Sequence, residues 1–179
     1  FYKKIEIILM KTSVNKLIFY VVCSFIFTSC WPDIGNSSGD PTIESIYEPI
    51  LMTREEFEES VIIEDPRNMG EVGKIYLIES YIFINDNNKG FHLYDNQDPT
   101  NPSVIKYINI PGSTDIAIRN NIAYVNQATD LIALSFTGNY ENIAVTERIR
   151  NVFPPQYLSP DGIYINYDIN KILVGWRLK

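Results

Sequence analysis

Cys30 is the residue whose chemistry says most about this chain. Lys11 and Lys16 come before an apolar run over residues 17–27, and two small hydroxyl residues separate that run from the cysteine. A short basic stretch, an apolar core and small residues before a cysteine are typical of an export signal whose cysteine becomes lipidated. The sequence therefore predicts Cys30 as a lipid-attachment residue.

The apolar run before Cys30 has the length of a signal peptide and is too short for a membrane-spanning helix. We therefore expect residues 1–29 to be a signal-peptide helix that starts at Met10, and the chain to be anchored to a membrane rather than to cross it. The final residues resemble a bacterial lipoprotein box, although Phe27 stands where an aliphatic residue is usual. The alternative is a plain membrane anchor, or a cleaved signal with an incidental cysteine.

Few other residues could carry covalent or metal chemistry. Cys23 lies inside the predicted signal peptide, and His92 is the single histidine of the chain. We therefore expect no disulfide framework and no thiol-rich or imidazole-rich metal site. The sequence indicates no catalytic residues, no metal ligands and no cofactor.

Two further groups were weighed as candidate sites. Residues 85–90 place oxygen donors before a glycine, as a calcium loop does. However, Lys89 falls at a ligand position and Asn96 stands where an EF-hand has its bidentate glutamate, so we expect a hairpin turn. His92 alternates with apolar neighbours on a predicted strand, and we expect a structural side chain rather than a catalytic one.

The charge of the chain limits its partners. The formal net charge is −7, and residues 1–29 carry four lysines and one glutamate, so the remainder carries −10. An acidic body repels phosphate backbones and anionic lipid head groups. We therefore expect no nucleic-acid partner, whereas sugars, peptides and neutral surfaces stay open.

Two segments precede the main body. Residues 30–46 are dominated by Gly, Ser, Asn and Pro, which predicts a flexible tether. Residues 47–72 are expected to form a short helical lead-in. Within them Thr53 and Glu56 have the spacing of a capping box and predict a helix over residues 54–60.

From residue 73 the chain consists of short runs rich in Ile, Val, Tyr and Phe, separated by turn-forming pairs. One such pair, Pro111-Gly112, suits the centre of a type II turn, because glycine takes a positive φ at little cost. The predicted strands cover residues 74–79, 81–85, 91–95, 104–110, 115–119, 122–126, 131–136, 144–149, 163–166 and 172–176. The sequence therefore predicts an all-β body over residues 73–179.

The strands also repeat. Residues 81–85 align with residues 122–126, and the aromatic residues at their centres, Phe83 and Tyr124, are 41 positions apart. A fainter third copy follows at residues 163–166, and each copy precedes a second strand after a polar turn. A period of about 40 residues with about four short strands in each unit is typical of β-propeller blades. A β-sandwich whose strands resemble one another by composition is the alternative.

Several motifs, taken in order, resemble those of the LVIVD-repeat family, which is named for a strand that ends in aspartate before an Asp-Pro-x-Asn-Pro turn. The motifs are residues 90–95, 98–102, 110–112, 115–117 and 123–125. The stretch 47–154 looks like exported lipoproteins of Bacteroidetes that carry such repeats. The resemblance implies a propeller-like fold and an outer-membrane location, facing the periplasm or the surface, and brings no known activity. Ser135 departs from the pattern, because aspartate is expected there.

The number of units leads to a further expectation. A closed propeller needs four or more blades of about 40 residues each, and residues 73–179 hold at most three. We therefore expect an incomplete β-propeller-like array of about two to three four-stranded blades. The count also suggests a truncated or interrupted gene product that lacks downstream blades.

These expectations favour a membrane-anchored exported lipoprotein with a non-enzymatic interaction or scaffold role. Its partner would be a protein or a glycan of the bacterial envelope. The alternative is a fragment of an exported glycan-acting or peptide-acting protein whose active residues lie on missing blades. A degenerate fragment without function is a third possibility.

Overall fold

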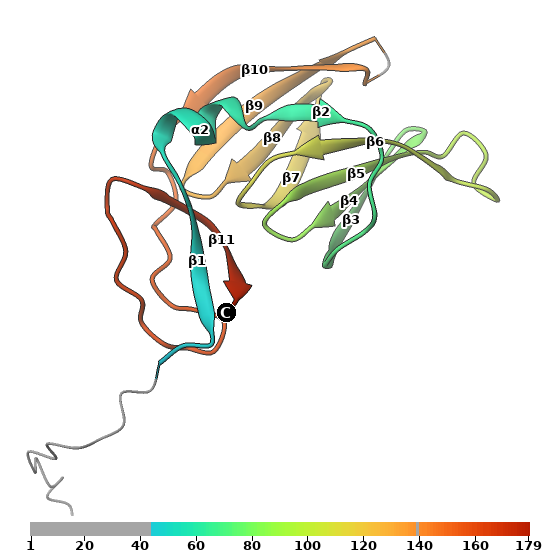
Figure 1. Cartoon of the computed structure of the whole chain (residues 1–179). Coiled ribbons are helices and arrows are strands. Elements are labelled where there is room, and N and C mark those ends of the chain that lie inside the picture. The colour runs from blue at the N-terminus through green and yellow to red at the C-terminus, as the bar shows by residue number, and fades with distance from the viewer. Residues whose placement is uncertain (1–43, 139) are drawn as a thin grey trace, which may run out of the picture. The chain divides into compact units, whose positions relative to one another are not determined.

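A computed structural model describes residues 44–138 and 140–179 of the chain. These residues form an all-β body of three antiparallel sheets with one short helix (Figure 1). The predicted signal peptide and Cys30, as well as the predicted tether up to residue 43, lie outside the described residues. No helix among the residues that are described has the length and apolarity needed to cross a membrane.

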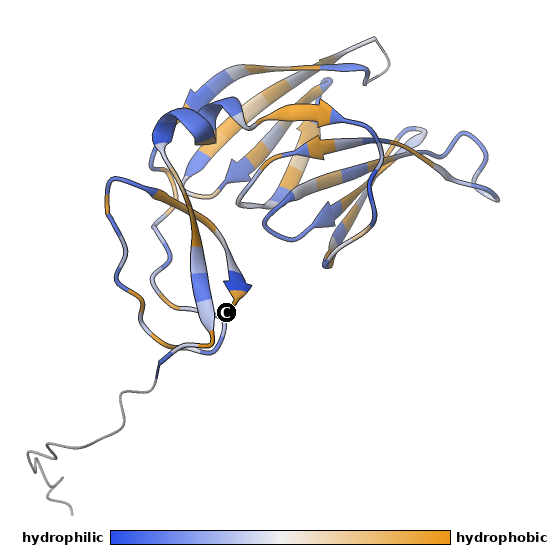
Figure 2. Ribbon diagram, in the orientation of Figure 1, coloured by the Kyte–Doolittle hydropathy of each residue, from blue (hydrophilic) through white to orange (hydrophobic). Residues whose placement is uncertain are grey.

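The first sheet is built on a four-strand meander. Its strands are β3 (Val72–Ile78), β4 (Tyr81–Asp86), β5 (Gly90–Asp95) and β6 (Ser103–Asn109), each paired antiparallel with the next. A fifth strand, β2 (Ile62–Glu64), pairs with the outer edge of β6. Strand β2 is mainly hydrophobic (Figure 2), whereas hydrophobic and hydrophilic residues alternate along β5 (Gly90–Asp95).

The second sheet is a meander of four strands. They are β7 (Ser113–Arg119), β8 (Ile122–Gln127), β9 (Asp130–Thr137) and β10 (Asn142–Ile149). Asn120 and Asn121 both have positive φ in the two-residue turn between β7 and β8, which is the backbone of a type I′ hairpin.

The turn that joins the two meanders was predicted correctly. The Ser113 N–H donates to the Ile110 carbonyl at 3.1 Å, and Gly112 has φ +82°. This geometry places Pro111 and Gly112 at the centre of a type II turn, as the sequence indicated.

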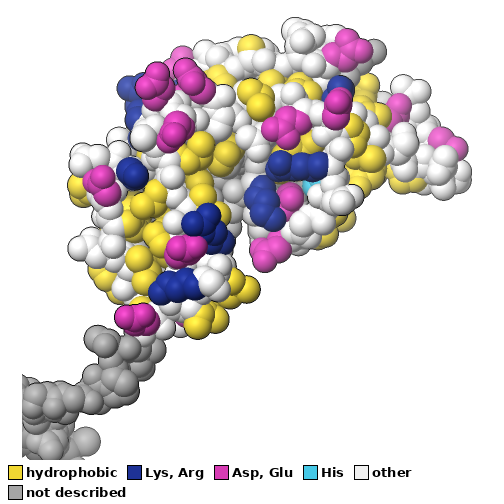
Figure 3. All heavy atoms as spheres, in the orientation of Figure 1, with side chains coloured by type: hydrophobic (Ala, Val, Ile, Leu, Met, Phe, Trp, Pro, Cys, Tyr) yellow, Lys and Arg dark blue, Asp and Glu magenta, His cyan; other side chains and the backbone are white. Residues whose placement is uncertain are grey.

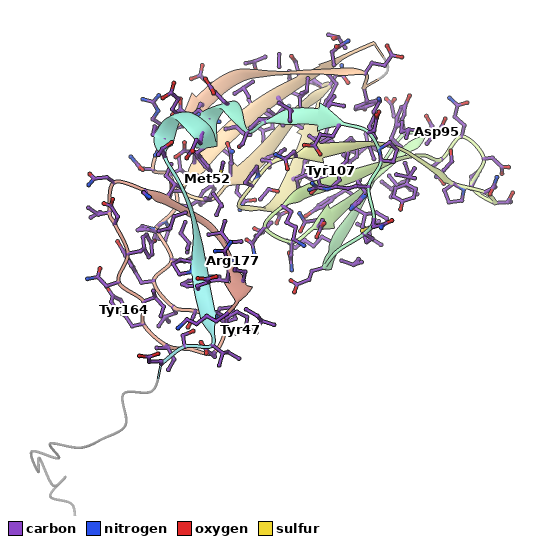
Figure 4. The ribbon with its side chains drawn as sticks, viewed as in Figure 1. Tyr47, Met52, Asp95, Tyr107, Tyr164 and Arg177 are labelled. Atoms are coloured by element: carbon purple, nitrogen blue, oxygen red, sulfur yellow. The ribbon has the colours of Figure 1, made fainter. Side chains whose placement is uncertain are left out.

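The third sheet joins distant parts of the chain. Strand β1 (Tyr47–Met52) pairs antiparallel with β11 (Ile172–Leu178). Tyr47 and Arg177 mark this pair in Figure 4, and Figure 3 shows acidic and basic side chains next to each other there. Arg177 Nε lies 2.6 Å from Glu48 Oε1 across the two strands.

Two expectations need correction. The predicted strand over residues 163–166 is not a strand: one isolated bridge joins Leu158 and Tyr164, and the Ser159 hydroxyl donates to the Ile163 carbonyl at 2.8 Å. Local turn bonds therefore replace a sheet ladder there. The lead-in over residues 47–72 contains the predicted helix but also strands β1 and β2, which form because distant strands offer them partners.

Helix α2 (Arg54–Glu59) follows its predicted cap. The Glu56 N–H donates to Thr53 Oγ1 at 3.3 Å, and the Thr53 N–H donates to Glu56 Oε2 at 2.8 Å, which completes the capping box. Phe57 is fully buried in a small cluster with Ile172 and Val174. The helix therefore packs the segment that follows β1 against β11.

Replacing Thr53 with alanine removes the hydroxyl that caps the Glu56 N–H and that also donates to Glu56 Oε2. We expect the free energy of unfolding to fall by about 1 kcal/mol, which is the usual cost of losing such a cap. Urea denaturation measures this change. Thr137→Ala, at an exposed strand end, is the matched control, and an equal loss in both variants would contradict the capping role.

The two meanders correspond strand by strand. Ile75 pairs with Ile84 in the first, and Ile116 pairs with Val125 in the second, at a constant offset of 41 residues. Pairing is irregular just before both Ile75 and Ile116, so the first strand of each meander is bulged at the same place. The aligned segments 81–85 and 122–126 therefore occupy equivalent positions, each as the second strand of its meander.

The main core lies between these two sheets. Each sheet contributes one face, and the buried side chains form one cluster. Its fully buried members include Phe83, Leu93, Val125, Ile132 and Leu134. Burial of such side chains contributes about 1.5–3 kcal/mol each, so this contact is the main source of stability for the body.

Candidate functional site

A cavity of about 840 Å³ lies between one end of the second sheet and the segment that leads to β11. Thr114, Asn126 and Thr129 line it from the ends of β7, β8 and the β8–β9 turn. Residues 151–157, Tyr167 and residues 169–175 form the rest of the wall, together with a few residues from α2 and neighbouring turns. The cavity thus gathers residues that are far apart in the sequence.

Stacked tyrosines form the aromatic part of the wall. The rings of Tyr157 and Tyr167, which both line the cavity, lie 5.4 Å apart and are inclined by 24°. Tyr164, labelled in Figure 4, stacks on Tyr157 at 5.6 Å but is not part of the lining. Such a column fixes the two lining rings as flat apolar surfaces.

The Tyr167 hydroxyl also holds the wall together. It donates to the Gln156 carbonyl at 2.7 Å. Burial raises the pKa of Tyr167, so the phenol keeps the proton that this hydrogen bond requires.

The polar part of the lining consists mainly of amides and hydroxyls. Asn88, Asn151 and Gln156 contribute amide groups, which both donate and accept hydrogen bonds. Among the described residues, the charged side chains of the lining are Arg54 and Lys171, and both are basic. Amides beside aromatic rings suit an uncharged ligand with many hydroxyl groups. This arrangement can bind such a ligand, and the part of the lining that the structure describes contains no carboxylate pair of the kind used in acid–base catalysis.

Asp130 holds the cavity wall in position through buried hydrogen bonds. Its side chain is 0% exposed and accepts hydrogen bonds from Arg54 Nη1 at 2.6 Å, Arg148 Nη1 at 3.0 Å and the Asn151 N–H at 3.1 Å. The Phe153 N–H donates to the Thr129 carbonyl at 2.9 Å. The start of the segment 151–157 is therefore fixed to the β8–β9 turn.

Charged donors keep Asp130 ionised. Burial by itself raises the pKa of this carboxyl, but the Asn151 amide and the two guanidinium groups outweigh burial and hold the pKa below its usual value. Arg148 also donates to Gln127 Oε1 at 2.8 Å, and Gln127 in turn donates to the Phe57 carbonyl at 3.0 Å. This network joins α2, the second sheet and the cavity wall.

The structure confirms that residues 85–90 form a hairpin turn. The Lys89 N–H donates to the Asp86 carbonyl at 2.9 Å. The Asp86 carboxylate accepts the Glu71 N–H at 3.0 Å and lies 3.3 Å from Lys89 Nζ. These contacts give the Asp86 carboxylate a structural role in the turn.

His92 is buried in the first sheet, away from the cavity lining. It is 1% exposed, and its Nε2 lies 3.8 Å from Asp86 Oδ2, which is beyond hydrogen-bond distance. Burial lowers the pKa of His92, although Asp86 opposes this shift, so the imidazole is neutral at pH 7. Its ring meets the edge of Tyr107 at 4.7 Å, and burial raises the pKa of Tyr107 to about 12.

The sequence does not indicate the cavity residues. Tyr164 lies in the predicted strand 163–166, where tyrosine indicates β-propensity, and Tyr157 and Tyr167 lie outside every predicted strand. One signal was present: the stretch 153–157 combines an aromatic pair with two prolines, which cannot continue a sheet ladder.

No protein-family model matches the chain, and neither a curated protein nor a solved structure shows significant similarity to it. We therefore infer what the cavity can bind from its own lining residues.

Proposed function

We propose that this chain is an exported lipoprotein, tethered to a bacterial membrane through Cys30, whose propeller-like body binds an uncharged glycan of the envelope without acting on it. The aromatic and amide-lined cavity is the observation that carries the ligand proposal. The basic, apolar and small-residue pattern before Cys30 supports the anchor, and the resemblance to LVIVD-repeat lipoproteins agrees with it.

The way in which the two sheets pack supports a propeller-like array. Residues paired across an antiparallel sheet lie on the same face. The first sheet uses the face that carries Tyr76, Phe83 and Leu93. After the offset of the repeat, the equivalent residues of the second sheet are Ala117, Tyr124 and Ala133, and these lie on the face that points away from the core.

The second sheet therefore packs through its opposite face, which carries Ile116, Val125 and Ile132. Stacking the front of one unit on the back of the next is the relation between neighbouring propeller blades. A sandwich of two related sheets would instead bring corresponding faces together across the core. The repeat thus favours the propeller interpretation over the sandwich that was weighed beside it.

The lining supports a glycan rather than a charged ligand. Pyranose rings present apolar C–H faces to aromatic side chains and hydroxyl groups to amides, and the wall supplies both around Tyr157 and Gln156. The basic side chain of Arg54 is already paired with Asp130, so Lys171 supplies the remaining positive charge of the described lining, a single charge for an anion.

Affinity electrophoresis tests the proposal. The full chain runs through native gels that contain neutral polysaccharides, namely a glucan, a mannan or a xylan. We expect at least one of them to retard the protein. Tyr157→Ala should weaken this binding about tenfold, which corresponds to about 1.4 kcal/mol, because one stacking surface is lost.

Tyr164→Ala is the matched control, because it removes the neighbouring ring of the same column without changing the lining. The control should keep near wild-type retardation. Absence of retardation by every neutral polysaccharide, or equal losses in both variants, would contradict the proposal.

A further inference from the structure

Each of the two large sheets leaves part of one face uncovered, and on the first sheet Arg67 covers the β5–β6 part of that face by lying over Tyr107. On the first sheet this face carries Ile75 and Leu77 of β3, which are exposed, and Ile82 and Ile84 of β4, which are half-buried. We refer to these four residues as the β3–β4 face. Leu77 is 66% exposed and Ile75 is 64% exposed, and a contiguous exposed apolar patch of this kind is typical of an interaction surface.

On the second sheet the uncovered face is hollowed. A depression of about 340 Å³ is lined by Ile122, Tyr124, Leu131 and Ile149, among others. We refer to these four residues as the β8–β9 face, which extends onto β10. Tyr124 is 44% exposed at its centre.

The internal repeat makes these two faces complementary. The β3–β4 face corresponds to Ile116, Ile118, Ala123 and Val125, which in the second sheet are covered by the first sheet. In the same way Ile122, Tyr124 and Leu131 correspond to Tyr81, Phe83 and Phe91, which in the first sheet cover the second. The β3–β4 face is thus equivalent to the second sheet's side of the core contact, and the β8–β9 face is equivalent to the first sheet's side. The two uncovered faces are therefore suited to cover each other.

Charge follows the same pattern. Lys74 and Asp115 occupy equivalent positions in the bulges of β3 and β7, and they form an ion pair across the core contact. Asp115 also accepts a hydrogen bond from the Tyr76 hydroxyl. If a second sheet of one copy covered a first sheet of another, Asp115 would again face Lys74. Opposite charges would then alternate along the stacked first strands.

We propose that the β8–β9 face of one copy of this chain binds the β3–β4 face of a second copy, repeating between chains the contact made within each chain. A second copy is the occupant that the structure favours, because it carries both complementary faces and the matching charges. The contact is head-to-tail, so it joins two different patches and either closes into a ring or continues into a longer assembly.

Co-purification of two tagged full-length copies tests this contact. The two copies carry different affinity tags, are expressed together and are extracted from membranes in mild detergent. We expect wild-type copies to co-purify. When both copies carry Leu77→Asp, or both carry Tyr124→Asp, recovery of the second tag should fall to less than a tenth of wild type, because a buried carboxylate disrupts the contact.

Mixing the two variants gives the decisive result. A Leu77→Asp copy keeps its β8–β9 face and a Tyr124→Asp copy keeps its β3–β4 face, so together they retain one intact contact. Recovery should therefore return when the two variants are co-expressed. Leu158→Asp, at a position that is 60% exposed but lies on neither face, is the control and should leave recovery unchanged.

Recovery that does not change in the single variants would overturn the proposal, and so would a failure of the mixture to restore it. Near-ultraviolet circular dichroism of each variant shows whether it is folded. A variant that does not fold is replaced by Ile75→Asp or Ile122→Asp on the same face. The result is independent of glycan binding, because neither face lines the cavity.

Discussion

Replacing Asp130 with alanine is expected to lower the free energy of unfolding by about 3–5 kcal/mol. The substitution leaves Arg148, whose side chain is largely buried, without the carboxylate that neutralises it. It also removes the acceptor of the Asn151 N–H, so the cavity wall should loosen as well. Chemical denaturation measures the loss of stability, and hydrogen exchange at residues 151–157 measures the loosening.

Asp65→Ala is the matched control for this substitution. Asp65 lies 3.1 Å from Lys106 at the surface, and its side chain is almost fully exposed. An exposed ion pair contributes about 0–1 kcal/mol, so the control should barely change stability. Equal effects of the two substitutions would contradict the structural role assigned to Asp130.

The same network predicts how stability depends on pH. Because the pKa of Asp130 is lower in the folded protein than in the unfolded chain, ionised Asp130 stabilises the fold above the unfolded pKa of about 3.9. This contribution is lost as the pH falls through the folded pKa. The difference in stability between the wild type and Asp130→Ala should therefore shrink in acid, below about pH 4, and stay constant from pH 6 to pH 8.

Replacing Gly90 with alanine should destabilise the protein about as much as Asp130→Ala does. We expect the free energy of unfolding to fall by about 3 kcal/mol or more. Gly90 has φ +151°, a backbone conformation that residues with a side chain rarely adopt. An added Cβ would lie 2.1 Å from the Ile108 carbonyl oxygen and 2.8 Å from Tyr107 Oη. The carbonyl belongs to strand β6, so the sheet itself would have to shift.

Gly175→Ala separates this clash from a general effect of glycine replacement. Gly175 lies in β11, and an added Cβ would come no closer than 3.6 Å to its neighbours. The free energy of unfolding of the Gly175→Ala variant should stay within about 0.5 kcal/mol of the wild-type value, because the substitution introduces no strain. Thermal unfolding of both variants tests the contrast, and a mild effect of Gly90→Ala would show that the first sheet is not packed as described.

Local patterns predicted much of this fold. Alternating β-branched and aromatic residues located the strands of both meanders, and Pro111-Gly112 marked the turn between them. The capping box at Thr53 located the helix. All these features depend on residues close together in the sequence, which is why a single chain could reveal them.

Long-range pairing was not predictable in the same way. Strand β1 forms because β11 lies beside it, and the paired residues of the two strands are 120 to 131 positions apart in the sequence. Residues 163–166 resemble a strand by composition but have no neighbouring strand with which to form a ladder. The cavity was missed for the same reason, because its tyrosines and Asn88 meet only after folding.

Hydrogen–deuterium exchange of the full chain shows whether the cavity beside β11 binds an uncharged glycan. The ligand is an oligosaccharide released from whichever neutral polysaccharide retards the protein. We expect slower exchange in residues 151–157 and 167–175 when this sugar is present, with β3 and β4 unchanged. Protection confined to other parts of the chain, or no protection at saturating sugar, would contradict glycan binding in the cavity.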